Sequence, residues 1–386
     1  MNVKRLLDNV EEYIIKQRRY FHENPELSWE EFNTSKRIRE ELDSMNIPYD
    51  VVKETGVIGT IRGSKPGKKL GIRADIDALP VQEETDLLYA SKKNGVMHAC
   101  GHDAHTAILL GTAKILNEMR DEISGEVRLI FQPAEECIQD SGAKYLSQVD
   151  SIKNLDRIIG MHVWGALESG KGALREGPIM ASADTFDIFI EGKSGHGAAP
   201  NTTVDPIVAG SMVVQALQTI VSRENDPLEP QVISVTAFNS GNSKNVIPGS
   251  AHLEGTVRTF NNELREHIKW QMKRVLSGVA EISRTKINLD YHEGTPSTIN
   301  EEMATQLGIK IAQEVFQESF VEDFPLQMGG EDFAKYLTRI PGCLLFLGAA
   351  GPAGKFNQHN EKFQIDESVL ILGVEYFTRY TLEYLK

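Results

Sequence analysis

A single short stretch, Cys100-Gly101-His102-Asp103-Ala104-His105, most constrains how this chain folds. A thiol and an imidazole on either side of one glycine can lie on the same side of a tight turn, close enough to hold one metal ion. Small and aliphatic residues at helical spacing from 104 to 119 predict a helix directly after the turn, with Asp103 as its N-cap. Alone, the stretch also fits a buried thiol beside solvated histidines, so other motifs must decide.

Further acidic and histidine residues stand at the ends of predicted strands. The strand at 69–74 runs into Asp75 and Asp77, the strand at 126–131 into Glu135 and Glu136, and the strand at 156–163 carries His162 near its end. Open α/β sheets bind ligands at the carboxyl ends of their strands, so we expect these side chains to line one pocket. The purely structural alternatives for these three motifs are a capped turn, a surface charge pair and a core histidine, respectively.

His359 lies in a glycine-rich loop after the predicted strand at 343–347, where it can reach the same pocket. The candidate metal ligands are then Cys100, His102, Glu136, His162 and His359. Five ligands are too many for one catalytic zinc with an open position, but they suit two divalent ions. The carboxylate left over, Glu135, can take a proton from water and pass it to a leaving amine. This set predicts hydrolysis of an amide or an ester.

A nucleophilic serine or cysteine is the weaker interpretation. No Gly-x-Ser-x-Gly motif occurs in the sequence, and Cys100, with histidines at 98 and 102, is better explained as a ligand.

The order of predicted elements indicates two domains in the 386 residues. Residues 1–183 and 295–386 alternate strands and helices, and we expect them to form two parts of one α/β catalytic domain around a mixed sheet. Between them, residues 184–294 show the order β-α-β-β-α-β of a ferredoxin-like α+β unit. The sequence therefore predicts an inserted domain at 184–294.

Charge and composition exclude several classes of partner. The net charge of −14 argues against nucleic acid or an anionic membrane as the main partner. The first twenty residues are charged throughout, without an apolar signal segment, and no long apolar run follows, so we expect a cytoplasmic protein. Three cysteines are too few for a disulfide framework, which leaves Cys100 available as a ligand.

Several longer motifs, in order along the chain, resemble those of one family. They are His22-Glu23-Asn24-Pro25-Glu26-Leu27-Ser28, Arg73 to Pro80, His98 to His105, Gln132 to Glu136, Gly160-Met161-His162, Gly195 to Pro200, Asn245 to Pro248, Gly255 to Arg258 and His359-Asn360-Glu361. With them the chain resembles the M20 metallopeptidase family, in particular its amidohydrolase branch of hippurate hydrolases, N-acyl-amino-acid deacylases and auxin-conjugate hydrolases.

The resemblance implies a catalytic domain with a two-metal site that takes manganese, zinc, nickel or cobalt, and a smaller lid domain that often mediates dimerisation, so we expect a homodimer. It implies the same five ligands and Glu135 as general base. It further implies that His196 stabilises the oxyanion and that Asn245 and Arg258 bind the substrate's carboxylate, for which a guanidinium fork is suited. An interdomain or dimer contact is the alternative role for the last two.

Two departures from the family pattern refine the expectation. Peptidase branches carry a His-x-Asp motif and a bridging aspartate, whereas this chain has Asp75-Ile76-Asp77 and Cys100, with both aspartates expected to support the site. The resemblance thus favours an amidohydrolase that cleaves N-acyl amino acids, with acetyl, benzoyl or similar acyl groups and a metal-bound water as nucleophile. The alternatives are a dipeptidase or carboxypeptidase with the same site and a non-catalytic metal-dependent binding protein. The second departure is Gly330, where serine is expected.

Overall fold

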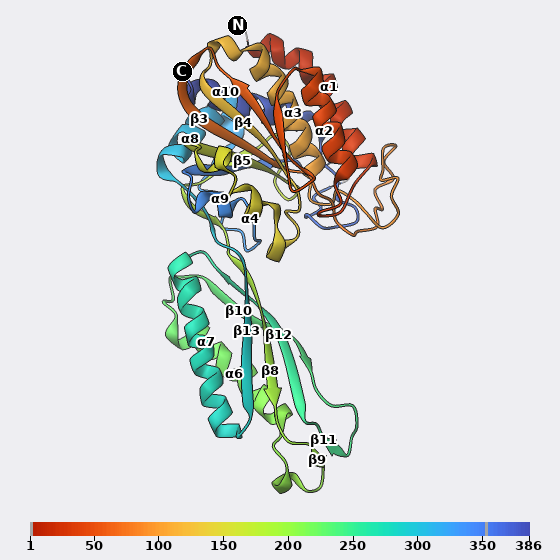
Figure 1. Cartoon of the computed structure of the whole chain (residues 1–386), viewed down its shortest axis with the longest axis vertical. Coiled ribbons are helices and arrows are strands. Elements are labelled where there is room, and N and C mark those ends of the chain that lie inside the picture. Colours follow the sequence, from red (N-terminus) through yellow and green to blue (C-terminus); the bar gives the residue numbers. More distant parts are fainter. Residues whose placement is uncertain (1–2, 352–353) are drawn as a thin grey trace. The chain divides into compact units, whose positions relative to one another are not determined.

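The computed structural model describes residues 3–351 and 354–386 (Figure 1). The chain forms two compact units. The first comprises Met1–Gly177, Ile299–Pro325 and Asp332–Lys386, and the second comprises Pro178–Thr298 and Leu326–Glu331. The second unit extends a few residues beyond 184–294 on both sides, and no sequence pattern indicated that the segment Leu326–Glu331 joins it.

A mixed eight-stranded sheet forms the centre of the first unit, in the order β1-β2-β4-β3-β5-β16-β6-β15. Its strands are β1 (Tyr49–Val52), β2 (Gly56–Arg62), β3 (Lys65–Asp75), β4 (Ser124–Gln132), β5 (Arg157–Trp164), β6 (Gly172–Leu174), β15 (Phe320–Glu322) and β16 (Gly342–Gly348). Strands β3, β4, β5 and β16 run parallel, so their carboxyl ends meet at one edge. The predicted α/β class with a mixed sheet is confirmed.

Helices pack around this sheet. They are α1 (Val3–Glu23), α2 (Phe32–Ser44), α3 (His102–Glu118), α4 (Gly142–Leu146), α5 (Asp150–Lys153), α8 (Glu302–Phe316), α9 (Ala334–Leu337) and α10 (Leu370–Tyr384). Helices α1, α3 and α10 pack against one another, and α3 also contacts β3 (Figure 1). Helix α1 is amphipathic and buries Leu6, Val10 and Ile14. Helix α3 is buried along most of its length, which fixes the turn at its start.

The second unit is a four-stranded antiparallel sheet in the order β10-β12-β8-β13, with two helices on one face, as in a ferredoxin-like fold (Figure 1). Its elements are β8 (Ala183–Glu191), β9 (Gly195–His196), α6 (Pro206–Thr219), β10 (Gln231–Asn239), β11 (Val246–Ile247), β12 (Ser250–Thr259), α7 (Asn262–Ser283) and β13 (Lys286–Thr295). The short strands β7 (Gly177–Met180) and β14 (Thr298–Asn300) lie at its boundaries. Phe186, Ile188 and Ile190 of β8 point into the core, and the alternate residues point to the open face.

Close packing within the second unit explains why position 330 is a glycine. A Cβ atom at this position would lie 2.6 Å from the Cβ of Ala183 and 3.0 Å from the Cγ2 of Thr295. Because a serine side chain has no room there, the departure from the family pattern at Gly330 accompanies close packing of β8 and β13.

No helix in the part of the chain that the structure describes is long and apolar enough to cross a membrane.

Candidate metal centre

The turn before α3 has the tight geometry that its glycine suggested. Gly101 has a φ of +90°, a conformation that glycine adopts without strain, and a Cβ atom there would meet Val163 Cγ2 at 2.2 Å. The prediction that Asp103 is the N-cap of α3 is wrong. The helix begins at His102, and the buried Asp103 carboxylate instead pairs with Arg18 Nε at 2.9 Å and His22 Nδ1 at 2.7 Å, because α1 lies against this turn.

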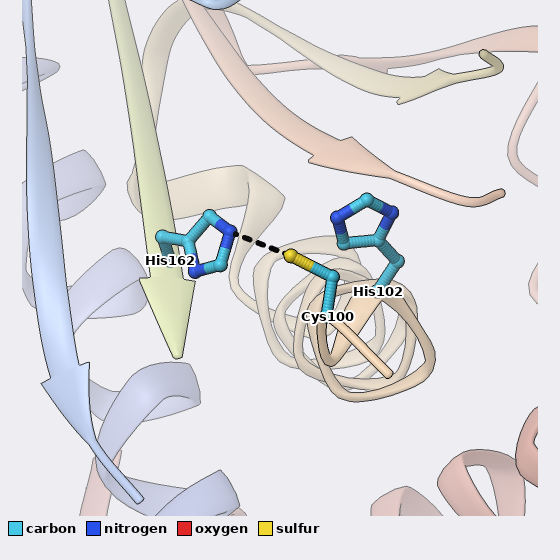
Figure 2. A group of neighbouring side chains, drawn as sticks. All are labelled: Cys100, His102 and His162. Atoms are coloured by element: carbon cyan, nitrogen blue, oxygen red, sulfur yellow. Dashed lines mark hydrogen bonds between the residues drawn. The ribbon is translucent and has the colours of Figure 1, made fainter. Parts of the chain in front are cut away.

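Cys100, His102 and His162 converge although His162 comes from β5 (Figure 2). Cys100 Sγ lies 3.5 Å from His162 Nε2, and one ligand atom of each residue lies within 4.8 Å of the other two. His162 Nδ1 donates to the carbonyl of Val163 at 2.7 Å, which leaves the lone pair on Nε2. Burial and the neighbouring His105 lower the pKa of His162 well below its usual value. A neutral imidazole of this kind has a lone pair with which it can bind a metal ion.

His102 is oriented in the same way. Its Nδ1 donates to the carbonyl of Asp77 at 2.9 Å. Its Nε2 is buried and has no hydrogen-bond partner among the described residues. Since buried polar atoms normally have a partner, this orphaned nitrogen fits a metal ion as the missing partner.

Glu135 and Glu136 lie in a bend after β4, rather than in the extended backbone expected from the sequence. The bend follows Ala134, whose φ is +52° and whose N–H donates to Glu31 Oε1 at 2.8 Å. Asp77 accepts the next two N–H groups, from Glu135 at 3.0 Å and from Glu136 at 3.1 Å. As a result both carboxylates reach His102, with ligand atoms of the three residues within 4.8 Å of one another.

His359 comes to the same place from the loop after β16. Its N–H donates to the carbonyl of Ala99 at 2.8 Å, which fixes the loop beside the Cys100 turn. His359 Nε2 lies 3.2 Å from Glu136 Oε1, and Cys100, Glu136 and His359 form a further group of possible ligands. The structure thus brings the five predicted ligands and Glu135 together.

The electrostatics of the site favour a cation. Burial disfavours a charged His102, yet Asp75, Asp77 and Glu136 together raise the pKa of its imidazole to about 10. The carboxylates therefore outweigh the cost of burying a positive charge. Divalent ions on a thiolate, imidazole and carboxylate set would supply that positive charge directly, so these residues fit the expected metal ions.

Asp75 lies beside His102 and His105 and is held by neighbouring groups. Its Oδ2 accepts from Arg73 at 2.6 Å, and its Oδ1 accepts from His105 Nδ1. His105 Nε2 accepts the N–H of Val163 at 2.8 Å, so both ring nitrogens of His105 are used. Although Asp75, His102 and His105 lie close together, His105 braces β3 and β5 instead of offering a ligand.

Sequence reasoning missed three residues of this support. His105 could have been found, because three residues after His102 it lies on the same helix face. Glu31 and Asp332 carry no such signal. Glu31 holds the Ala134 N–H, and the Asp332 N–H donates to Glu135 Oε1 at 3.4 Å.

The remaining predicted site residues lie in the second unit. His196 on β9 pairs with Val246 on β11, and the N–H of Gly197 donates to the carbonyl of Asn245 at 2.8 Å, so His196 and Asn245 are neighbours. His196 Nδ1 accepts the N–H of Ala198 at 3.0 Å, which places the ring proton on Nε2. Arg258 donates to the carbonyl of Val257 at 3.0 Å, and no carboxylate of residues 3–351 or 354–386 forms an ion pair with it.

Comparisons with known proteins identify the family of the chain. The model of peptidase family M20/M25/M40 matches residues 71–383. The chain is 42% identical to thermostable carboxypeptidase 1 of Saccharolobus solfataricus, over 94% of this chain and 93% of the relative. It is 41% identical to N-acetylcysteine deacetylase of Bacillus subtilis, over 94% of each chain.

A solved structure described as a dinuclear metal-binding peptidase of the M20 family, from Bacillus subtilis, superimposes with a TM-score of 0.86. It is 38% identical, and the match covers 98% of this chain and 99% of that one. The agreement extends over both units of the chain. This chain belongs to peptidase family M20/M25/M40, a family of hydrolases, and to its amidohydrolase branch.

Proposed function

We propose that the chain hydrolyses the amide bond of N-acyl amino acids to a carboxylic acid and a free amino acid. The observation that carries this proposal is the position of Glu135, a carboxylate within 4.8 Å of His102 and Glu136. Its main chain is fixed by Asp77, so the carboxylate is presented beside the ligand set rather than at a mobile surface. The N-acetylcysteine deacetylase relative, similar over nearly the whole chain, supports the substrate class.

Cys100, His102, Glu136, His162 and His359 would hold two divalent ions of manganese, zinc, nickel or cobalt. Such ions polarise a carbonyl group and lower the pKa of water. Glu135 takes the proton of the attacking water on its carboxylate and delivers it to the leaving nitrogen. The Asp77 carboxylate accepts the main-chain N–H of Glu135, and the Asp332 N–H donates to Glu135 Oε1, so both the backbone and the carboxylate of Glu135 are held in place.

We assign the second unit the role of a lid that contributes to substrate binding and to a homodimer. His196, with its proton on Nε2, has the donor required at a developing oxyanion. Arg258 has guanidinium capacity left for a substrate carboxylate, because its hydrogen-bond partners among the described residues are main-chain carbonyls and the Thr256 hydroxyl. Asn245 adds an exposed amide beside His196.

The test combines a substrate panel with two neighbouring variants. Metal-stripped protein, with and without added manganese or zinc, is given N-acetyl, N-benzoyl and longer N-acyl amino acids. Glu135→Gln is expected to lower kcat by about 10²–10⁴-fold with metal content unchanged. Glu136→Gln, the matched control, is expected to lose metal. Full activity of metal-loaded Glu135→Gln would exclude Glu135 as the base.

A metallo-carboxypeptidase or dipeptidase using the same residues is the second candidate, favoured by the similarity to thermostable carboxypeptidase 1. Comparing N-acetylphenylalanine with alanylphenylalanine separates the two, since only the group on the amide differs. Faster cleavage of the dipeptide favours this candidate. Tight metal binding with no cleavage of either substrate favours a non-catalytic role.

A further inference from the structure

The open face of the sheet in the second unit carries a cluster of ionisable side chains from three adjacent strands. Asp187 lies on β8, His252 and Glu254 on β12, and His292 on β13. We call these four residues the sheet-face cluster. Its ion pairs and ring contacts in the described part of the chain lie within the second unit, and it shares no residue with the candidate metal centre.

The cluster is arranged around the Asp187 carboxylate. His252 Nε2 lies 2.6 Å from Asp187 Oδ1, and His292 Nε2 lies 3.0 Å from Asp187 Oδ2. His252 Nδ1 lies 3.6 Å from Glu254 Oε1. One ligand atom each of Asp187, His252 and Glu254 lies within 4.8 Å of the other two, a spacing that could hold one ion.

The strand register places like charges opposite one another here. Asp187 is paired with Glu254 on one side and with Asp290 on the other, so three carboxylates form one row across the sheet. Like charges directly opposite destabilise a sheet. The row therefore favours a bound cation of higher charge than an imidazolium.

The backbone of β8 beneath the sheet-face cluster is held in place by the core. The neighbours of Asp187, Phe186 and Ile188, are buried in the core on the opposite face, which fixes the backbone of β8. The ring of His252 stacks on Phe189, with 4.6 Å between centroids and 3° between planes. Ligands held on strands in this way lose little freedom when an ion binds.

We propose that Asp187, His252 and Glu254 form a divalent metal site on the open face of the second unit. One imidazole and two carboxylates suit a borderline ion such as Zn²⁺. His292 is a positioning residue that holds the second oxygen of Asp187, the usual role of a group behind a ligating carboxylate. The ion links β8 to β12 and relieves the repulsion along the row.

The test counts zinc ions bound per full-length chain after equilibrium dialysis against Zn²⁺ alone. His252→Ala is expected to bind one ion fewer than the unmodified protein, and Glu254→Gln is expected to weaken the same site at least about tenfold. His267→Ala, which removes an exposed histidine of α7 outside the cluster, is the matched control and should bind the full number.

His292→Ala tests the positioning role. This variant should bind the full number of zinc ions, but with a lower affinity at the proposed site. Zinc perturbation of the His252 ring resonances in the unmodified protein gives a second readout that needs no variant. Equal zinc numbers and affinities in the unmodified protein and in folded His252→Ala would overturn the proposal, as would unperturbed His252 resonances.

Discussion

The carboxylate of Asp77 accepts the main-chain N–H of Glu135 at 3.0 Å, and through its second oxygen it accepts that of Glu136 at 3.1 Å. A single side chain thus orients both the proposed base and a proposed ligand. Asp77→Asn keeps only one acceptor oxygen, and we expect metal affinity to fall about 10–100-fold. Competition with a chromophoric chelator measures the change. Ser28→Ala, which removes only the hydroxyl donor to Asp77, should have a smaller effect.

Gly101, in the turn before α3, gives a prediction about stability. Gly101→Ala combines a φ of +90° with a Cβ contact of 2.2 Å to Val163, so we expect it to lower the free energy of unfolding by about 2–4 kcal/mol. Gly95→Ala is the matched control, since Gly95 has a φ of +74° with no atom within 4 Å, and it should cost about 1 kcal/mol. Urea denaturation of both variants measures the difference, and equal losses would contradict the steric argument.

Glu31 predicts a pH dependence of stability. Burial, and then the charge of Asp77, raise the pKa of Glu31 from 4.5 to about 7. Between these values the folded protein holds a proton that the unfolded chain has lost, so the free energy of unfolding falls as the pH rises through this window. The loss should be on the order of 1–3 kcal/mol.

Glu31→Gln removes this titration while its amide oxygen can still accept from Trp29 and Ala134. We therefore expect the variant to lose less stability than the unmodified protein between pH 5 and pH 8. Urea denaturation at both values, with chelator present throughout, provides the measurement. Parallel losses in the two proteins would show that Glu31 does not titrate in this range.

The role proposed for Arg258 predicts that efficient cleavage requires the carboxylate of the substrate. Under the proposed function, Arg258→Ala should lower kcat/KM by about 10–100-fold for an N-acyl amino acid, chiefly through KM. It should have little effect on the corresponding N-acyl amino acid amide, which lacks the negative charge. Arg274→Ala, which removes an exposed arginine paired with Glu224 on the same unit, serves as the control. Equal losses on both substrates would exclude the carboxylate role.

The α/β class and the group of ligand-type residues could be predicted because both depend on local pattern. Cys100 and His102 share a turn, Glu136 follows a strand and His162 lies near the end of another, and the apolar runs of both strands are evident in the sequence. Parallel strands then bring these ends to one edge whatever the details of packing.

The support behind those residues could not be predicted, because it depends on contacts between distant segments. Glu31 holds the Ala134 N–H, and Arg18 reaches Asp103 from another helix. Neither contact produces a periodic pattern or a characteristic residue spacing in the sequence. Asp103 was predicted to be a helix cap because its local sequence fits one, and tertiary pairing with Arg18 and His22 overrode that preference.

The main-chain bond between His359 and Ala99 has a consequence for biosynthesis. Cys100, His102 and His162 are translated well before His359, which completes a group with Cys100 and Glu136. A chain that has not yet reached residue 359 lacks one of the five proposed ligands, so the complete proposed set can form only after His359 has been synthesised.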